Sequence, residues 1–272
     1  MERVCIDDLY DILGHIISEK EGFSVVYNMY GGKIVKIFDY RYLERLLSDG
    51  IDIENKIISS SPIDSIPEII VPSDVIYDSN GNFCGYTMES ADGINFDNYI
   101  SIMKSGRYSY NFNLNDFNEQ FCLLEDIVMR SNNIVFPNLM DSGNILYGST
   151  FSLIDYDCIQ INDFLSPKLS DYLGDRSKYY NTKYMNGNFY TKELDIKSLI
   201  HLYFMVVYNC DLNKVDKCSI EYVFNKLGIN NNILYDRVMR LYDDSLNNLC
   251  LGGCLSNIDS DDSFGKTLIK KL

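Results

Sequence analysis

Hydrophobic and polar positions alternate through much of the first 90 residues, a pattern typical of β-strands that bury one face. Strands are expected over residues 15–18, 21–27, 33–38, 69–71, 75–77 and 83–89. Gly22 and the pair Gly31-Gly32 supply the connections between the first three, and Asn80-Gly81 is a strong hairpin signal before the last. This part of the chain is therefore expected to form an antiparallel sheet.

Helical spacing of apolar residues marks the remaining segments. Helices are expected over residues 4–13, 39–61, 114–129 and 193–208, with two amphipathic segments over 218–227 and 233–246. The helix over 39–61 has break signals at 48–50 and ends before Pro62. In 114–129 the apolar positions fall on one stripe, which predicts a buried helix: Phe117, Phe121, Leu124 and Val128. An acidic tail at 259–262 is expected to be solvated.

A short hairpin is predicted where two apolar runs, 145–147 and 151–154, flank the turn residues 148–150. A hairpin brings its outer ends together, so Asn144 and Asp155 would lie side by side. An amide oxygen and a carboxylate suit Mg²⁺, which takes its other ligands from water and phosphates. The same residues also fit an ordinary surface hairpin with polar ends.

Composition narrows the classes of function. The chain has 272 residues, of which 46% are hydrophobic and 23% are charged, as in an ordinary globular protein with ample core. Its formal charge of −15 argues against a nucleic-acid partner, because binding to phosphates requires clustered Lys and Arg. The acidic surface permits a basic protein partner, and it would equally serve solubility.

The cysteine content and the hydropathy of the chain indicate its cellular compartment. The eight cysteines contain no C-x-x-C pair and there are two histidines, which is not a zinc pattern and fits a reducing cytoplasm. The longest apolar stretch, 199–210, is too short to span a bilayer, and no leader sequence is recognised at the start. A cytoplasmic protein without a membrane segment is expected.

Several of these features follow one another as in the protein-kinase-like superfamily. Asn144-Ile-Leu followed by Leu153-Ile-Asp155 resembles the catalytic-loop Asn and the Asp-Phe-Gly-type metal ligand of that family. Gly22-Phe-Ser-Val-Val-Tyr27 resembles the end of the glycine-rich loop, and Gly85-Tyr-Thr-Met-Glu89 resembles the strand that enters the hinge. Asp195 matches the start of the central helix of the large lobe and implies an acceptor for backbone N–H groups of the catalytic loop.

The resemblance covers roughly residues 15 to 247 and implies a fold. It implies an α+β, bilobal protein-kinase-like fold, with a small antiparallel β lobe and one main helix over 1–90. A larger, mostly helical lobe would follow over 91–272 and contain the catalytic loop, the metal-binding hairpin and the activation segment.

The resemblance also implies how ATP and Mg²⁺ would be held. Lys36 would point into the nucleotide cleft and pair with Glu54, with Ile58 in the apolar stack behind. Taken by itself, Lys36 equally fits a solvent-facing strand lysine. Residues expected to contact the nucleotide are Gly22, Ser24, Val26, Lys36, Met88, Glu89, Ala91 and Leu146. Residues expected to hold the metal are Asn144, Asp155 and Asp157.

The chain departs from the family in its catalytic loop. Leu139 stands where the family has the catalytic Asp, and the neighbouring Asn138 cannot accept a proton either. Asp141 is the carboxylate of this loop and would be either a displaced base or a cap on the turn. Asp157 replaces the Gly after Asp-Phe and would either add a metal ligand or fix the loop. The glycine loop carries Glu19 and Glu21 instead of its earlier glycines.

Two functions follow from the resemblance. The first is an atypical, bacterial-type kinase: an ATP- and Mg²⁺-dependent phosphotransferase acting on Ser or Thr of a protein, in which positioning and charge neutralisation replace the base. Catalytic roles then fall on Lys36, Glu54, Asp141, Asn144 and Asp155. The alternative is a pseudokinase that acts as a nucleotide-binding or protein-interaction scaffold. The altered catalytic loop favours this alternative, and the retained Lys, Glu, Asn and Asp favour the enzyme.

Overall fold

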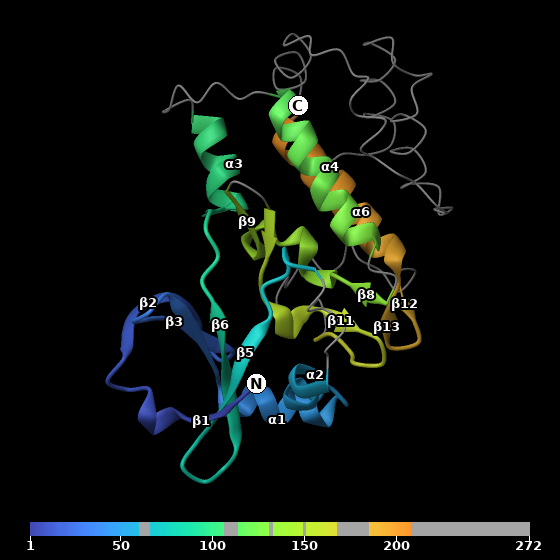
Figure 1. Ribbon diagram of the computed structural model, residues 1–272. Helices are drawn as coiled ribbons and strands as arrows, with labels where there is room; N and C mark the ends of the chain where they lie inside the picture. Colours follow the sequence, from blue (N-terminus) through green and yellow to red (C-terminus); the bar gives the residue numbers. More distant parts are fainter. Residues whose placement is uncertain (60–65, 106–113, 131–132, 149–150, 168–184, 208–272) are drawn as a thin grey trace, which may run out of the picture.

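The computed structural model describes residues 1–59, 66–105, 114–130, 133–148, 151–167 and 185–207. The described chain is α+β. A six-stranded sheet with two helices beside it is formed by the first 89 residues, and longer helices with several two- and three-stranded pieces follow (Figure 1).

The main sheet has the strand order β1-β5-β6-β4-β3-β2. Its strands are β1 (Arg3–Cys5), β2 (Leu13–Lys20), β3 (Ser24–Met29), β4 (Lys33–Phe38), β5 (Pro72–Tyr77) and β6 (Phe83–Glu89). All neighbouring strands are antiparallel except β1 and β5, which pair in parallel. The antiparallel sheet expected from the sequence is confirmed, and β4 has the bounds that the alternation predicts. The strand expected over 69–71 is wrong, because Ile69 forms only an isolated bridge with Leu153 of β10.

The helix expected over residues 4–13 is wrong. The segment forms β1 and a short 3₁₀ turn, η1 (Ile6–Asp8). Val4 lies opposite Ile76 of β5, and Leu9 is buried in a small cluster with Val35 and Ile76. The apolar spacing that suggested a helix therefore serves an edge strand and a turn that pack against a sheet formed later in the chain.

The helical segment after β4 is divided as its break signals indicate. Helix α1 (Tyr40–Ser48) begins at the cap Asp39, whose carboxylate accepts a hydrogen bond from the N–H of Arg41 at 2.8 Å. Gly50, with φ of 80°, lies in the break, where a left-handed conformation favours glycine. Helix α2 (Ile53–Ser59) follows and buries Ile53, Lys56 and Ile57.

The second half of the described chain is built on three helices: α3 (Phe96–Ser105), α4 (Leu114–Arg130) and α6 (Lys192–Val207). The predicted stripe of α4 is confirmed as buried, and Phe121 packs edge-on against Tyr203 of α6 with ring centroids 5.3 Å apart. One hydrophobic cluster extends from Phe38 and Tyr86 of the sheet to these helices. In the described ranges, no helix has both the length and the apolar character required to cross a membrane.

Short elements connect the helices to the sheet. They are β7 (Ile94–Asn95), β8 (Ile134–Val135), η3 (Pro137–Met140), η4 (Ser142–Asn144), β9 (Ile145–Tyr147), β10 (Phe151–Leu153), η5 (Tyr156–Cys158), β11 (Gln160–Ile161), β12 (Met185–Asn186) and β13 (Phe189–Tyr190). The predicted hairpin is confirmed, because β9 and β10 are antiparallel with Ile145 opposite Leu153. The segments 218–227, 233–246 and 259–262 lie outside the described residues.

Candidate functional site around Lys36

Lys36 lies at the centre of β4, between Val26 of β3 and Tyr86 of β6. Alternation along the strand sends Val35 into the small cluster on one face and the side chain of Lys36 to the other face. Lys36 is only 4% exposed, so a solvent-facing strand lysine is ruled out. A charge buried to this extent requires partners.

Two carboxylates bind the ammonium group of Lys36. Its Nζ is 3.0 Å from Asp155 Oδ1 and 2.8 Å from Asp157 Oδ1. The hydroxyl of Tyr86 donates to the same oxygen of Asp157 at 2.8 Å. Three elements, β4, β6 and the segment after β10, therefore meet at one buried cluster of charge.

The pKa shifts agree with a buried ion pair. Burial alone would lower the pKa of Lys36, but the two carboxylates outweigh this effect and hold the pKa well above its usual value. Burial alone would raise the pKa of Asp157, yet the charge of Lys36 and the hydrogen bond from Tyr86 hold it below its usual range. Both partners thus remain charged because each stabilises the other.

Glu54 is not the partner of Lys36, which corrects the expectation from the sequence. Its Oε1 accepts a hydrogen bond from the hydroxyl of Tyr77 at 2.6 Å, on the outer side of α2. The reason is the rotation of the helix: Ile53 and Ile57 anchor the buried face, so Glu54 and Ile58 share the outer face. Ile58 is accordingly 49% exposed and is not part of an apolar stack.

Lys56 occupies the buried face of α2 that Glu54 was expected to occupy. Its ammonium group donates to the backbone carbonyls of Asp157 at 2.5 Å, Ile159 at 2.9 Å and Leu165 at 3.4 Å. Burial lowers the pKa of Lys56 to about 8, although the charge of Asp157 opposes the shift. Lys56 thus attaches the segment that follows Asp155 to helix α2.

Sequence reasoning missed Lys56 and Tyr86. The signal for Lys56 was the spacing of Ile53 and Ile57, since a residue three positions after Ile53 lies on the same helical face. Tyr86 had no such signal, because its place opposite Lys36 depends on the register of β6 against β4, two strands that are not consecutive in the chain.

The ends of the β9–β10 hairpin meet as expected. The N–H of Ile154 donates to the carbonyl of Asn144 at 3.0 Å, which places Asn144 beside Asp155 along the backbone. Asp155 adopts a left-handed conformation, with φ of 62° and ψ of 54°, which is uncommon for a residue other than glycine. Its side chain is 30% exposed and is therefore partly accessible to solvent.

These two residues fit a magnesium ion. The amide nitrogen of Asn144 donates to the carbonyl of Asn138 at 3.2 Å, which orients the amide so that its oxygen remains as a ligand. The carboxylate of Asp155 supplies the second oxygen. Among the described residues there is no group of three or more His, Cys, Asp or Glu side chains arranged for a metal. Magnesium in proteins commonly takes its other ligands from water and phosphate.

Asp157 does not fit as a metal ligand, which corrects the third metal assignment. Its side chain is 3% exposed, and its Oδ1 binds both Lys36 and Tyr86. A carboxylate enclosed in this way fixes the segment after Asp155, the second of the two roles considered for it.

The loop before Asn144 contains no accessible carboxylate at the expected position. Leu139 and Asn138 are 2% and 3% exposed. Asp141 Oδ1 accepts a long hydrogen bond of 3.4 Å from the N–H of Gly143, and its carbonyl accepts one from the N–H of Asn144 at 2.8 Å. This geometry resembles a turn cap more closely than a base.

Asp195 has the structural role that the sequence indicated. Its Oδ1 accepts a hydrogen bond of 2.8 Å from the N–H of Phe136, at the start of the loop that leads to Asn144. Lys192 lies 2.8 Å from its other oxygen. Burial raises the pKa of Asp195, while the charge of Lys192 opposes this shift.

Besides Lys36 on β4, the candidate nucleotide contacts lie on β3, β6 and β9, in the turn before β3 and just after β6. Gly22, with φ of 73°, forms that turn, and Ser24 and Val26 follow on β3. The remaining candidates are Met88 and Glu89 at the end of β6, Ala91 just beyond it, and Leu146 on β9. Met88 is buried and Glu89 is exposed. Their contacts with a nucleotide stay a prediction.

Comparison with solved structures finds a kinase domain of similar fold. The crystal structure of the BubR1 kinase domain matches with a TM-score of 0.52 and 13% sequence identity, over 95% of this chain and 83% of that chain. No family model matches the chain, and no curated protein matches it. At this identity the likeness shows the fold alone, so this chain has a kinase-like fold.

Proposed function

We propose that this chain binds Mg·ATP in a kinase-like, bilobal arrangement, with the boundary between lobes near residue 90. Its reaction would be an atypical phosphotransfer to Ser or Thr of a protein. The kinase-like fold supports the proposal, and the cluster around Lys36 carries it: a buried lysine is held beside the Asn144–Asp155 pair at the end of a hairpin.

The residues divide the binding of the nucleotide between them. Lys36 would offer its ammonium group to the phosphates, and Asn144 and Asp155 would hold magnesium through an amide and a carboxylate oxygen. The bound metal would neutralise charge on the phosphates. Asp157, Tyr86 and Lys56 keep Lys36 and the segment after Asp155 in place. Ion pairs that are already formed reduce the reorganisation that binding requires.

A second candidate, a pseudokinase scaffold, is favoured by the loop before Asn144. The buried Leu139 cannot accept a proton, and Asp141 is directed at a backbone N–H of its own turn. Such a protein would bind nucleotide without transferring phosphate, or would present its surface to a partner.

A thermal-shift titration with ATP, with and without Mg²⁺, tests nucleotide binding. A specific ligand adds RT ln(1 + [L]/Kd) to the free energy of unfolding, about 2.7 kcal/mol at a hundredfold excess over Kd. We expect a magnesium-dependent shift that is lost in Asp155→Asn and retained in Asp141→Asn. Asp155→Asn is a cleaner variant than Lys36→Ala, because Asp157 keeps its charged partner.

The outcomes separate the candidates. The absence of a shift in the wild-type protein would overturn the nucleotide site. A shift together with phosphate transfer to a Ser/Thr peptide or to the chain itself, detected by mass spectrometry, would support the enzyme. A shift without transfer would support the scaffold. Unchanged transfer in Asp141→Asn would show that Asp141 is not a displaced base.

A further inference from the structure

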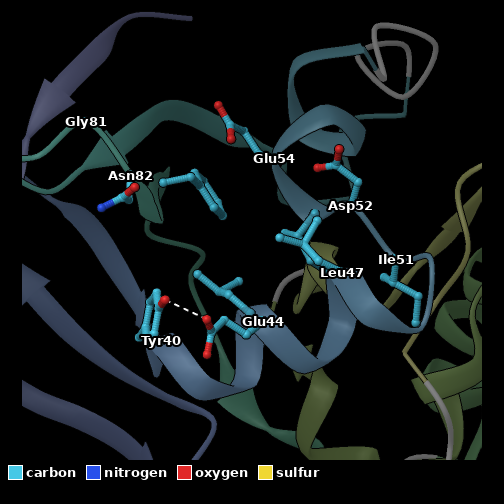
Figure 2. Close-up of a pocket in the computed structure, with 11 residues that line it drawn as sticks. Tyr40, Glu44, Leu47, Ile51, Asp52, Glu54, Gly81 and Asn82 are labelled. Atoms are coloured by element: carbon cyan, nitrogen blue, oxygen red, sulfur yellow. Dashed lines mark hydrogen bonds between the residues drawn. The ribbon is translucent and has the colours of Figure 1, made fainter.

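A cavity of about 430 Å³ opens beside helix α2 (Figure 2). Helices α1 and α2 and the turn between β5 and β6 form its walls. Its aliphatic and phenylalanine lining comes from Leu43, Leu47, Ile51, Ile53 and Phe83. Leu47 is 59% exposed, so it presents a large aliphatic side chain to solvent at this site.

Three carboxylates surround the apolar surface: Glu44, Asp52 and Glu54. Among the described residues that line the cavity there is no Lys, Arg or His. In a chain with a formal charge of −15, this cavity therefore adds a local concentration of negative charge to an attractive field for cations.

Each of these carboxylates is oriented by a hydrogen bond through one oxygen. Glu44 accepts from the hydroxyl of Tyr40 at 2.6 Å, as the dashed line in Figure 2 shows. Glu54 accepts from Tyr77 at 2.6 Å, and Asp52 accepts from the N–H of Asn55 at 2.9 Å. Carboxylates held in this way lose less side-chain entropy when a cationic ligand binds.

We propose that this cavity is a docking site for a basic segment of a partner protein. One aliphatic or aromatic side chain of the segment would pack against Leu47 and Phe83, and flanking Lys or Arg side chains would pair with Glu44, Asp52 and Glu54. The volume falls within the range of ligand sites, roughly 300 to 1,000 Å³, and it accommodates a large side chain. Charge complementarity selects this partner over an acidic or neutral one.

The docking site does not rest on the proposed nucleotide binding. Its residues lie on α1, at the start of α2 and in the turn between β5 and β6, and none of them is Lys36, Asn144 or Asp155. Failure of peptide binding would therefore not count against nucleotide binding, and failure of the ATP titration would not count against the docking site.

Fluorescence anisotropy with the full chain and a labelled peptide tests the proposal. The probe carries the core Lys-Arg-Phe-Lys-Arg, and two control peptides replace either the Phe by Ala or the four basic residues by Glu. We expect saturable binding of the probe, at least fivefold weaker binding of the Ala peptide and no binding of the Glu peptide. Affinity should fall as salt is raised, because exposed charges are screened. No binding of the probe, or equal binding of the Ala peptide, would overturn the proposal.

Matched variants locate the binding. Glu44→Gln/Asp52→Asn/Glu54→Gln removes three charges but keeps an oxygen acceptor at each position, and we expect it to weaken the probe at least tenfold. The control Asp7→Asn/Asp8→Asn/Glu19→Gln removes the same charge from exposed residues of η1 and β2 that do not line the cavity. If both triple variants lost the same affinity for the probe, binding would depend only on the net negative charge of the chain, and the docking site would be overturned. Leu47→Asn, at an exposed position, should weaken the probe but not the Ala peptide.

Discussion

On the inner face of helix α2, Lys56 is completely buried and its ammonium group binds three backbone carbonyls of the segment after Asp155. On the outer face, two positions earlier, Glu54 is partly exposed and binds one tyrosine hydroxyl. The ammonium group of Lys56 connects α2 to the segment after Asp155, and the ion pair of Lys36 with Asp157 connects β4 to the same segment. The carboxylate of Glu54, in contrast, lines a cavity that is open to solvent.

The buried charges of Lys36, Lys56 and Asp157 are therefore expected to stabilise the fold more than the partly exposed charge of Glu54. A buried charge that loses its partner pays the full cost of desolvation, whereas an exposed charge is screened by water and contributes little. The carboxylate that fixes Lys36 comes from position 157 and not from the helix, so the pairing of β4 with the Asp155 segment does not depend on a helical acid. Substitutions should therefore have large effects on the inner face and small effects on the outer face.

The largest effect is expected for the Lys36–Asp157 pair. Lys36→Met leaves a buried carboxylate without its cation and should lower the free energy of unfolding by about 3 to 5 kcal/mol. The double variant Lys36→Met/Asp157→Asn should be less destabilised than the sum of the two single changes, because the orphaned charge is gone. Chemical denaturation of all four proteins measures the coupling, and additive losses would contradict the pair.

Lys56→Met should have the next largest effect. The thioether keeps the apolar stem but leaves the carbonyls of Asp157, Ile159 and Leu165 without their donor, at a cost of about 2 to 3 kcal/mol. Hydrogen exchange should also increase specifically across residues 157–165. Glu54→Gln provides the matched control on the same helix, and an equal increase there would show that the attachment does not depend on Lys56.

The pH dependence of stability should differ between the wild-type protein and Lys56→Met. The pKa of Lys56 is about 8 in the folded chain, against an ordinary value of 10.5, so between these values the unfolded chain binds a proton that the folded chain does not. The contribution of Lys56 to stability is therefore fully present above 10.5 and is lost as pH falls through 8. The Tm of wild type minus that of Lys56→Met should rise from pH 7 to pH 10, and a constant difference would contradict the shifted pKa.

The smallest effect is expected on the outer face of α2. Glu54→Gln retains an acceptor for Tyr77 and should change the free energy of unfolding by less than about 0.5 kcal/mol. The magnesium-dependent shift with ATP should also be unchanged, since Lys36 is held by Asp155 and Asp157. Loss of that shift in Glu54→Gln would restore the role that the sequence suggested for this residue.

Sequence patterns predicted the elements that local signals define. Alternation defines β4, the apolar stripe defines α4, and two short apolar runs around a turn define the β9–β10 hairpin that joins Asn144 to Asp155. Each of these signals lies within a single segment. The parallel pairing of β1 with β5 joins residues more than seventy positions apart, and no local pattern at Val4 contains that information.

The sequence predicted which residues lie at the candidate site, but it did not predict which carboxylate pairs with Lys36. Lys36, Asn144 and Asp155 could be placed because strand alternation and hairpin geometry fix their direction. The partner of Lys36 could not, because it depends on how α2 is rotated against the sheet and on whether Asp157 faces inward. In a helix of two turns, Ile53 and Ile57 determine that rotation, and family spacing alone selected the wrong face.

The outer strand of the main sheet has a consequence for how the protein behaves in concentrated solution. Among the described strands β2 pairs with β3 alone, and Ile16 and Ile17 on this edge are 50% and 51% exposed. A long, regular, apolar edge would invite strand addition from other molecules and aggregation. Two register shifts, on either side of Ile16, interrupt the regular edge, and Glu19 and Lys20 place charge at its end. We expect these irregularities to hinder fibril-like association at an edge that exposes isoleucines.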